Sequence, residues 1–344
     1  MSEQLLELRN CSKSFYGVPV LRSVDLTVAP GEINALVGQN GSGKSTLIKC
    51  LSGYHAPGAG ATLAIDGIDV PFPYDANVPR AHGLAFVHQQ LGLAPNLTVL
   101  ENLRIGRFTT GRGWRIRWRE NDRGVREMLA KVGVDDIDPH ALVGSLAPVQ
   151  RAMVAVARAL EVIEARGTGV LVLDEATAYL PREDVGHLFD AVEKLAVSGA
   201  GVVFVTHRLE EVRRLSHRVT VLRDGACVAA GQTASFSDRE LVELIVGRSM
   251  TDLYPQHGDV REDVIFAAES VSGSEVKTFD LRLHRGETVG VTGLAGMGQE
   301  SIPYLLFGSD PQPSGHISVA GKRIDLKDVR PGRAIQLGMG LVPG

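Results

Sequence analysis

The chain alternates between short apolar runs and longer segments with a helical period. Apolar runs rich in β-branched residues have the length of buried strands at 33–37, 170–173 and 202–205. Segments whose apolar residues follow a helical spacing predict helices at 44–51, 149–165 and 182–196. Because strands that alternate with helices form parallel sheets, the pattern predicts an α/β fold.

Glycine positions recur along the chain at one spacing of 255 residues. The matching pairs are Gly31-Glu32 and Gly286-Glu287, Gly38 and Gly293, Gly43 and Gly298, and Gly53 and Gly308. This recurrence indicates two related domains. We expect a first domain over 3–247, a linker rich in turn formers and charge over 248–263, and a second domain over 264–344. Since the second segment is much shorter, we expect it to be the N-terminal part of such a domain.

Bulk composition limits the classes of function. The 344 residues are 44% hydrophobic and 22% charged, which is typical of a globular chain of about two domains. A net charge of −4 argues against nucleic-acid binding along the whole chain. The cysteines Cys11, Cys50 and Cys227 are scattered, so they predict free thiols. There is no secretion signal and no apolar run of ~18 residues, so we expect membrane association only through a partner.

A phosphate-binding loop is the clearest motif. The stretch GQNGSGKS at 38–45 matches GxxxxGK[ST] between a predicted strand and a predicted helix. Glycines let backbone N–H groups curl around phosphates, and the helix N-terminus adds partial positive charge. Lys44 is expected to reach the β- and γ-phosphates, and Ser45 to bind Mg²⁺. The expected nucleotide-binding residues are Gly38, Asn40, Gly41, Ser42, Gly43, Lys44, Ser45 and Thr46.

Polar residues also follow two of the other predicted strands. Asp174 and Glu175 end the strand at 170–173, and His207 follows the strand at 202–205. Because ligands of open α/β sheets lie at the carboxyl ends of strands, these residues can converge on Lys44. Asp174 would then hold Mg²⁺ and Glu175 would polarise the attacking water. Taken alone, the acids are also explained as solvated strand ends, and His207 as a structural histidine.

Together these residues resemble the ATP-binding subunits of ABC transporters, and in particular the ribose-type carbohydrate importers with two nucleotide domains in tandem. The resemblance covers essentially the whole chain. It implies a P-loop NTPase fold of the ABC ATPase type, with a helical subdomain at about 90–160 and an antiparallel β part, followed by the start of a second related domain. The sequence FVHQQ at 86–90 resembles the family's Q-loop. It implies a catalytic, Mg²⁺-contacting role for Gln89, with Gln90 as the alternative.

The resemblance also implies an adenine-binding aromatic residue and a join between domains. Lys13-Ser14-Phe15 resembles the loop that stacks on adenine, with Tyr16 as a second candidate and core packing as the alternative for Phe15. Val246-Gly247-Arg248, followed by Tyr254-Pro255, resembles the family's interdomain join.

Other motifs depart from the family pattern. The signature LSGGQ is replaced by LAPVQ at 146–150, which loses a hydroxyl, a backbone N–H and a glycine. The D-loop reads AYLP at 178–181, and Ala176 replaces a proline. In the second domain, Gln299 and Glu300 stand where lysine and a hydroxyl are needed. Since the family forms each site from two domains, we expect one competent half-site, one degenerate site, and slow hydrolysis by this chain alone.

By resemblance, the expected function is an ATP-hydrolysing subunit of an importer for a sugar or similar small polar solute, using ATP and Mg²⁺. The implied partners are transmembrane permease subunits, contacted through 90–146, and indirectly an extracytoplasmic solute-binding protein. The implied location is peripheral, on the cytoplasmic side of the inner membrane, with no nucleic acid. Two alternatives stay open: a soluble ABC-type ATPase that acts on nucleic acid or the ribosome through GRGWRIRWRENDR at 111–123, and a nucleotide-gated regulatory module.

Overall fold

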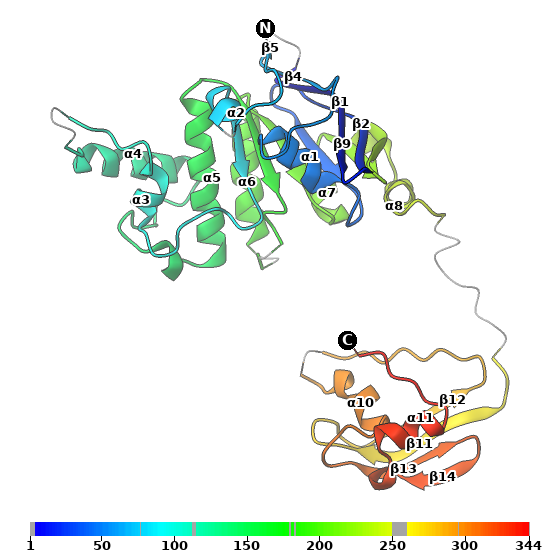
Figure 1. The fold of residues 1–344 in the computed structure, drawn as a ribbon. Coiled ribbons are helices and arrows are strands. Elements are labelled where there is room, and N and C mark those ends of the chain that lie inside the picture. The colour runs from blue at the N-terminus through cyan, green and yellow to red at the C-terminus, as the bar shows by residue number, and fades with distance from the viewer. Residues whose placement is uncertain are drawn as a thin grey trace. The chain divides into compact units, whose positions relative to one another are not determined.

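The computed structural model describes residues 4–75, 77–111, 115–178, 180–181, 184–249, 260–294 and 296–343. It divides into two compact units, 1–253 and 254–344 (Figure 1). The predicted first domain, 3–247, lies within the first unit. Part of the predicted linker, 250–259, lies outside the described residues and includes Tyr254-Pro255 of the predicted join.

A central sheet forms the core of the first unit. Its strand order is β10-β9-β3-β8-β7-β6, and the strands from β9 to β6 are parallel, with β10 antiparallel at one edge. The bounds are β3 Ile33–Val37, β6 Leu84–Val87, β7 Val170–Asp174, β8 Gly201–Val205, β9 Arg218–Arg223 and β10 Ala226–Gln232. Every residue of β3 and β8 is buried, and all except Asn34 are apolar, as expected for a sheet covered on both faces. All three predicted strands are confirmed.

A second, antiparallel sheet in this unit has the order β2-β1-β4-β5. Its strands are β1 Leu6–Phe15, β2 Val18–Val28, β4 Thr62–Ile65 and β5 Ile68–Asp69. Buried residues of β1 and β2 pack on helix α1 (Lys44–Leu51), which follows β3. The sheet therefore supports the helix that begins at the phosphate loop.

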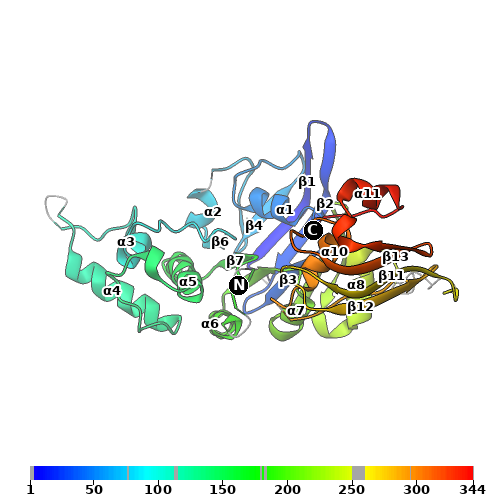
Figure 2. The same cartoon turned by 90° about the horizontal axis from the view of Figure 1, so that it is seen from below.

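Helices complete the first unit. The predicted helices are confirmed at α1, at α5 (Pro148–Glu164) and at α6 (Val185–Val197), although Arg182 and Glu183 lie outside the described residues. Helices α3 (Val99–Arg104) and α4 (Trp118–Lys131) pack beside α5, away from the central sheet (Figures 1 and 2). The other helical segments are α2 Asn77–Ala81, η2 Val143–Ser145, α7 Leu209–Leu215, η3 Thr233–Ser235 and α8 Asp238–Val246. Within the described residues, no helix is long and apolar enough to cross a membrane.

The second unit repeats the antiparallel sheet of the first. Its order is β12-β11-β13-β14, so β11, β12, β13 and β14 take the places of β1, β2, β4 and β5. The elements are β11 Val264–Ser272, β12 Phe279–His284, η4 Gln299–Ser301, α10 Ile302–Leu306, β13 Ser314–Val319, β14 Lys322–Asp325, η5 Leu326–Asp328 and α11 Pro331–Gln336.

Details of the turns recur as well. The carboxylate of Glu32 accepts a hydrogen bond from the N–H of Ala29 at 2.8 Å, and Glu287 accepts one from His284 at 2.7 Å. These two pairs are 255 residues apart, like the repeated glycines. The two units therefore share local backbone structure at equivalent positions.

Candidate functional site

The loop between β3 and α1 forms a cavity whose shape depends on glycine. A Cβ atom on Gly38 would lie 2.2 Å from the carbonyl oxygen of Leu222. Gly43, at φ +104°, is the N-cap of α1, and its own Cβ would meet Leu21 at 2.8 Å. The cavity, of about 350 Å³, is lined by Val20, Asn40, Gly41, Ser42, Gly43, Lys44, Ser45, Thr46 and Glu175. All the expected phosphate-loop residues except Gly38 line it, and Gly38 lines a second cavity at the same loop.

Lys44 supplies a buried positive charge to this cavity. Its side chain is 5% exposed, and Nζ donates to the carbonyl oxygens of Gly38 at 2.7 Å and Gln39 at 3.0 Å. Burial lowers the pKa of Lys44, while Glu175 and Asp174 raise it. A phosphate that enters the cavity would meet a poorly solvated ammonium group, to which it can bind strongly.

The predicted acids and the histidine lie at the carboxyl ends of neighbouring parallel strands in the central sheet. Asp174 is the last residue of β7, which pairs in parallel with β6 and β8. Burial raises the pKa of Asp174, whereas His88 and Lys44 lower it. Glu175 has φ +49°, a conformation that costs a non-glycine residue on the order of 1 kcal/mol. His207, after β8, places Nδ1 3.7 Å from Oε1 of Glu175.

A neighbouring cavity joins these groups to the phosphate loop. It has a volume of about 510 Å³, and its polar lining comes from Gln39, Asn40, Glu175 and His207. Gln89 lies exposed just after the carboxyl end of β6, at the same edge of the sheet. The structure thus brings Lys44, Asp174, Glu175 and His207 around the loop and sets Gln89 at the adjoining strand end.

The chemistry of the donor groups fits a nucleotide with Mg²⁺. Helix α1 has no side-chain N-cap and no acidic residue in its first turn, so its N-terminus is open to an anion. The buried Ser42 Oγ has no hydrogen-bond partner within the described structure. Ser45, Asp174 and Gln89 offer oxygen ligands, which Mg²⁺ prefers. Within the described ranges, no cluster of three or more His, Cys, Asp or Glu residues could hold a metal.

Phe15 is not among the residues that line the phosphate cavity. It ends β1 half-buried, and its ring packs edge-on against His55 with the centroids 5.0 Å apart. Lys13 Nζ lies 5.3 Å from the centroid of the same ring. Tyr16, the second candidate, is fully exposed. The role of Phe15 in adenine stacking therefore stays a prediction.

The altered signature opens helix α5. Ala147, at the N-cap, makes no side-chain cap, and Pro148 occupies the first turn. The side-chain oxygen of Gln150 instead accepts from the N–H of Ala147 at 3.0 Å. In the D-loop, Leu180 is buried, while Tyr179 lies outside the described residues.

The loop of the second unit repeats two positive-φ glycines of the phosphate loop, with Gly296 and Gly298 in the places of Gly41 and Gly43, but its charges differ. Gln299 Nε2 donates to the carbonyl oxygen of Gly293 at 3.4 Å, whereas Lys44 Nζ donates to the equivalent oxygen of Gly38 at 2.7 Å. Glu275 takes the position of Val20, 255 residues earlier, and accepts from Ser301 Oγ at 2.5 Å. Glu300 adds a carboxylate to the first turn. Sequence reasoning missed Glu275, because only the structural repeat places it beside this loop.

We expect that Gln299→Lys alone does not create a second nucleotide site, because Glu275 and Glu300 would still repel phosphate. Titration calorimetry should give one Mg-ATP per chain in the variant, as in the wild type. The control is the triple variant that combines Gln299→Lys with Glu275→Val and Glu300→Ser, since it removes both carboxylates. A second equivalent of nucleotide bound by Gln299→Lys alone would contradict this explanation.

Arg158 is another residue that the sequence did not reveal. From α5, it donates to the carbonyl oxygens of Gly92 at 2.6 Å and Leu91 at 2.8 Å, just beyond Gln89 and Gln90. Burial lowers the pKa of Arg158. Arg158 also lines a cleft of about 260 Å³ with Arg80, His88 and Asn102 among its polar residues. It thus ties the segment after the Q-loop to the helix that begins at the signature.

The basic segment at 111–123 is partly neutralised where it is described. Arg117 pairs with Glu120 at 2.9 Å, and Asp122 pairs with Arg126 at 3.0 Å, all on or beside α4. The ring of Trp118 packs edge-on against Phe108. Residues 112–114, which include Trp114, lie outside the described structure. Nothing in this geometry favours nucleic-acid binding.

A family model and several known proteins are similar in sequence to this chain. A family model described as "ABC transporter" matches residues 21–178. The arabinose import ATP-binding protein AraG 1 of Burkholderia lata is 40% identical over 98% of this chain. The ribose import ATP-binding protein RbsA 1 of Streptomyces avermitilis is 40% identical over 99%. The chain spans 66% and 64% of the lengths of these two relatives.

Solved structures share the fold of the first unit. The ADP conformation of MJ1267, an ATP-binding cassette of an ABC transporter, has a TM-score of 0.59 at 23% identity; the match covers 72% of this chain and all of that one. The dimeric MJ0796, a bacterial ABC transporter cassette, has a TM-score of 0.55 at 26% identity, over 66% of this chain and 98% of that one.

Proposed function

The chain belongs to the family of ABC transporter ATP-binding proteins, and from this premise we propose that it hydrolyses ATP to energise import of a sugar or similar small polar solute. One observation carries the proposal. Around the glycine-rich loop between β3 and α1, the structure brings together Lys44, Asp174, Glu175 and His207. Its relatives are named arabinose import and ribose import ATP-binding proteins, which supports the substrate class.

We propose a separate role for each of these residues. The N-terminus of α1 and the buried ammonium of Lys44 would bind the β- and γ-phosphates. Glu175, facing the same cavity, would orient the attacking water, and His207, 3.7 Å from that carboxylate, would hold it and the γ-phosphate in place. Ser45, Asp174 and Gln89 would hold Mg²⁺, which neutralises charge on the phosphates when bound.

We propose further that this chain supplies one competent half-site. A complete site in this family takes a signature from a second nucleotide domain. Here Pro148 has no N–H to offer and Ala147 has no hydroxyl, and loss of one such donor can cost ~3 kcal/mol of transition-state stabilisation. The loop at Gln299 lacks the lysine and the hydroxyl of a phosphate loop, so only the loop at Lys44 would support turnover.

The permease would contact the surface between Gln90 and Leu146. The cleft beneath Arg158 opens beside this region, and its lining combines cations with apolar side chains such as Phe86 and Ile105. Ile105 is 59% exposed, which suits it to a protein contact. Docking there would hold the chain peripherally on the membrane and connect permease movement to Gln89 through the Arg158 contacts.

The proposal predicts one Mg-ATP bound per chain and slow hydrolysis in the absence of a partner domain with an intact signature. Calorimetry and steady-state phosphate release on the purified chain test both points. Addition of a partner ATP-binding domain should raise the rate by about a hundredfold or more, as expected from one restored donor. Fast hydrolysis by the chain alone, abolished by Glu175→Gln, would contradict the half-site. No nucleotide binding at all would contradict the function.

A further inference from the structure

A buried carboxylate outside the expected motifs connects the two catalytic segments. Glu211 is 6% exposed and lies in the first turn of α7. Its Oε2 accepts from the hydroxyl of Thr206 at 2.5 Å and from the hydroxyl of Thr177 at 3.0 Å. Its Oε1 accepts from the guanidinium group of Arg208 at 3.2 Å. A buried carboxylate is stable only when its oxygens are paired in this way.

Both threonines adjoin residues of the candidate site. Thr206 immediately precedes His207, and its hydroxyl also accepts from the N–H of Arg208 at 3.1 Å, so both neighbours of the His207 backbone are fixed. Thr177 lies two residues after Glu175 and immediately before the D-loop. The N–H of Ala178 donates back to the carbonyl oxygen of Glu175 at 3.1 Å. One carboxylate therefore restrains the backbone on both sides of the contact between Glu175 and His207.

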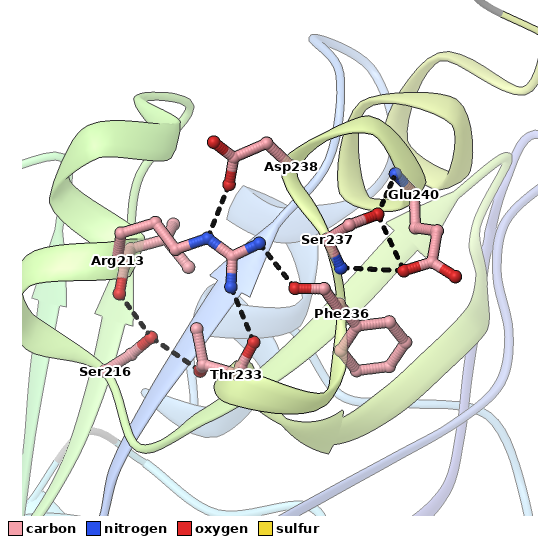
Figure 3. Close-up of polar contacts among 8 residues, drawn as sticks. Arg213, Ser216, Thr233, Phe236, Ser237, Asp238 and Glu240 are labelled. Atoms are coloured by element: carbon pink, nitrogen blue, oxygen red, sulfur yellow. Dashed lines mark hydrogen bonds and ion pairs between the residues drawn. The ribbon is translucent and has the colours of Figure 1, made fainter.

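The helix that carries Glu211 is itself anchored at its other end. Figure 3 shows Arg213 reaching from α7 toward the start of α8. It donates to the carbonyl oxygens of Thr233 at 2.7 Å and Phe236 at 2.6 Å, which precede α8, and to the carboxylate of Asp238, the first residue of α8, at 2.7 Å. Ser216, at the end of α7, contacts the hydroxyl of Thr233 at 2.9 Å. Because α7 is held in this way, the position of Glu211 is set by the fold and not by the loops it binds.

We infer that Glu211 is a positioning residue for hydrolysis, which holds Glu175 and His207 in register through Thr177 and Thr206. The inference rests on the proposed ATPase function for its catalytic consequence and on geometry alone for the restraint. Glu175 adopts a strained positive φ, so its backbone needs restraint from its surroundings. Small displacements of a catalytic group reduce rate strongly while binding of substrate elsewhere is unaffected.

The test compares Glu211→Leu with Glu210→Gln in the full chain. Glu210 is the adjacent residue of α7 and is exposed, so its substitution removes the same charge from the same helix. Thr177→Val and Thr206→Val each remove a single hydroxyl group. These milder variants test the same contacts if Glu211→Leu does not fold. Hydrogen exchange of peptides covering 174–178 and 203–209 reports the restraint. Single-turnover hydrolysis of radiolabelled ATP with protein in excess reports the chemistry, and calorimetry reports Mg-ATP affinity.

We expect Glu211→Leu to lower the single-turnover rate at least thirtyfold and each threonine variant about three- to tenfold, with Mg-ATP affinity within threefold of wild type. Exchange should rise in both peptides, and Glu211→Gln, which can still accept from the threonines, should restore most of the rate. Unchanged exchange in those peptides, or equal effects from Glu210→Gln, would overturn the inference. Faster exchange with an unchanged rate would overturn it too. A wild-type chain without hydrolysis would refute the proposed function, and the exchange data would still decide the restraint.

Discussion

Lys44→Ala is expected to weaken Mg-ATP binding by about a hundredfold or more, which corresponds to roughly 2.7 kcal/mol of binding free energy. The ammonium group is buried and lies in the cavity where the loop glycines and the N-terminus of α1 converge. A charge-assisted contact in such a poorly solvated place contributes much more than one at the surface. Alanine would leave the helix intact, because it has the highest helix propensity. Calorimetric titration with Mg-ATP gives the affinity directly.

Lys49→Ala is the matched control for this substitution. Lys49 lies on the same helix, is exposed, and has its Nζ 5.8 Å from the ring centroid of Tyr54. Its removal changes the net charge by the same amount, so we expect Mg-ATP affinity within threefold of wild type. If both variants lost affinity equally, the binding energy would come from the total positive charge on α1 and not from a local contact in the cavity. If neither did, the phosphate site would lie elsewhere.

Glu175→Gln is expected to reduce the single-turnover rate of ATP hydrolysis by at least a hundredfold while Mg-ATP affinity stays within a few-fold of wild type. Glutamine keeps the size of the side chain but cannot polarise water as a carboxylate does. The local fold should persist, because the N–H of residue 175 donates to the carbonyl oxygen of Val205 at 3.1 Å, a contact independent of the side chain. Rapid-quench measurements with protein in excess resolve this step even where turnover is slow.

Asp174→Asn provides the contrast with Glu175→Gln. Asp174 is expected to act on Mg²⁺, so its substitution should raise the magnesium concentration required for half-maximal binding, whereas Glu175→Gln should not. The pKa of Asp174 is raised by burial, so its affinity for Mg²⁺ should begin to fall at a higher pH than for an exposed aspartate. A Glu175→Gln variant that hydrolyses ATP normally would remove Glu175 from the mechanism.

Local motifs were enough to predict the elements around the phosphate loop. The GxxxxGKS pattern requires a strand before it and a helix after it, and the structure has β3 and α1 at the expected residues. Apolar runs ending in acids or histidine likewise predicted β7 and β8. In both cases the information is contained in a few consecutive residues, because a parallel strand is buried on both faces and its carboxyl end meets the ligand edge.

Contacts between distant segments could not be predicted in this way. Glu211 follows His207 on a short helix and resembles an ordinary solvated helix residue until the fold brings its carboxylate to the hydroxyl of Thr177. Arg158 acts through backbone carbonyl oxygens of Leu91 and Gly92, which carry no residue-type signal. Glu275 needs the second hairpin to be built before it lies beside Ser301. Each depends on tertiary packing, so the single sequence does not distinguish it from a surface residue.

The glycine turns of the second unit imply an uneven tolerance of mutation. A Cβ on Gly298 would lie 2.3 Å from the carbonyl oxygen of Glu275, and one on Gly308 2.6 Å from that of Val329. These are backbone atoms, so the clash cannot be relieved by moving a side chain, and both residues have positive φ. Gln299 and Glu300 meet no such limit. Substitutions that change the charges of this loop are therefore tolerated, whereas substitutions of its turn glycines are not. The shape of the loop can persist after its original chemistry has been lost.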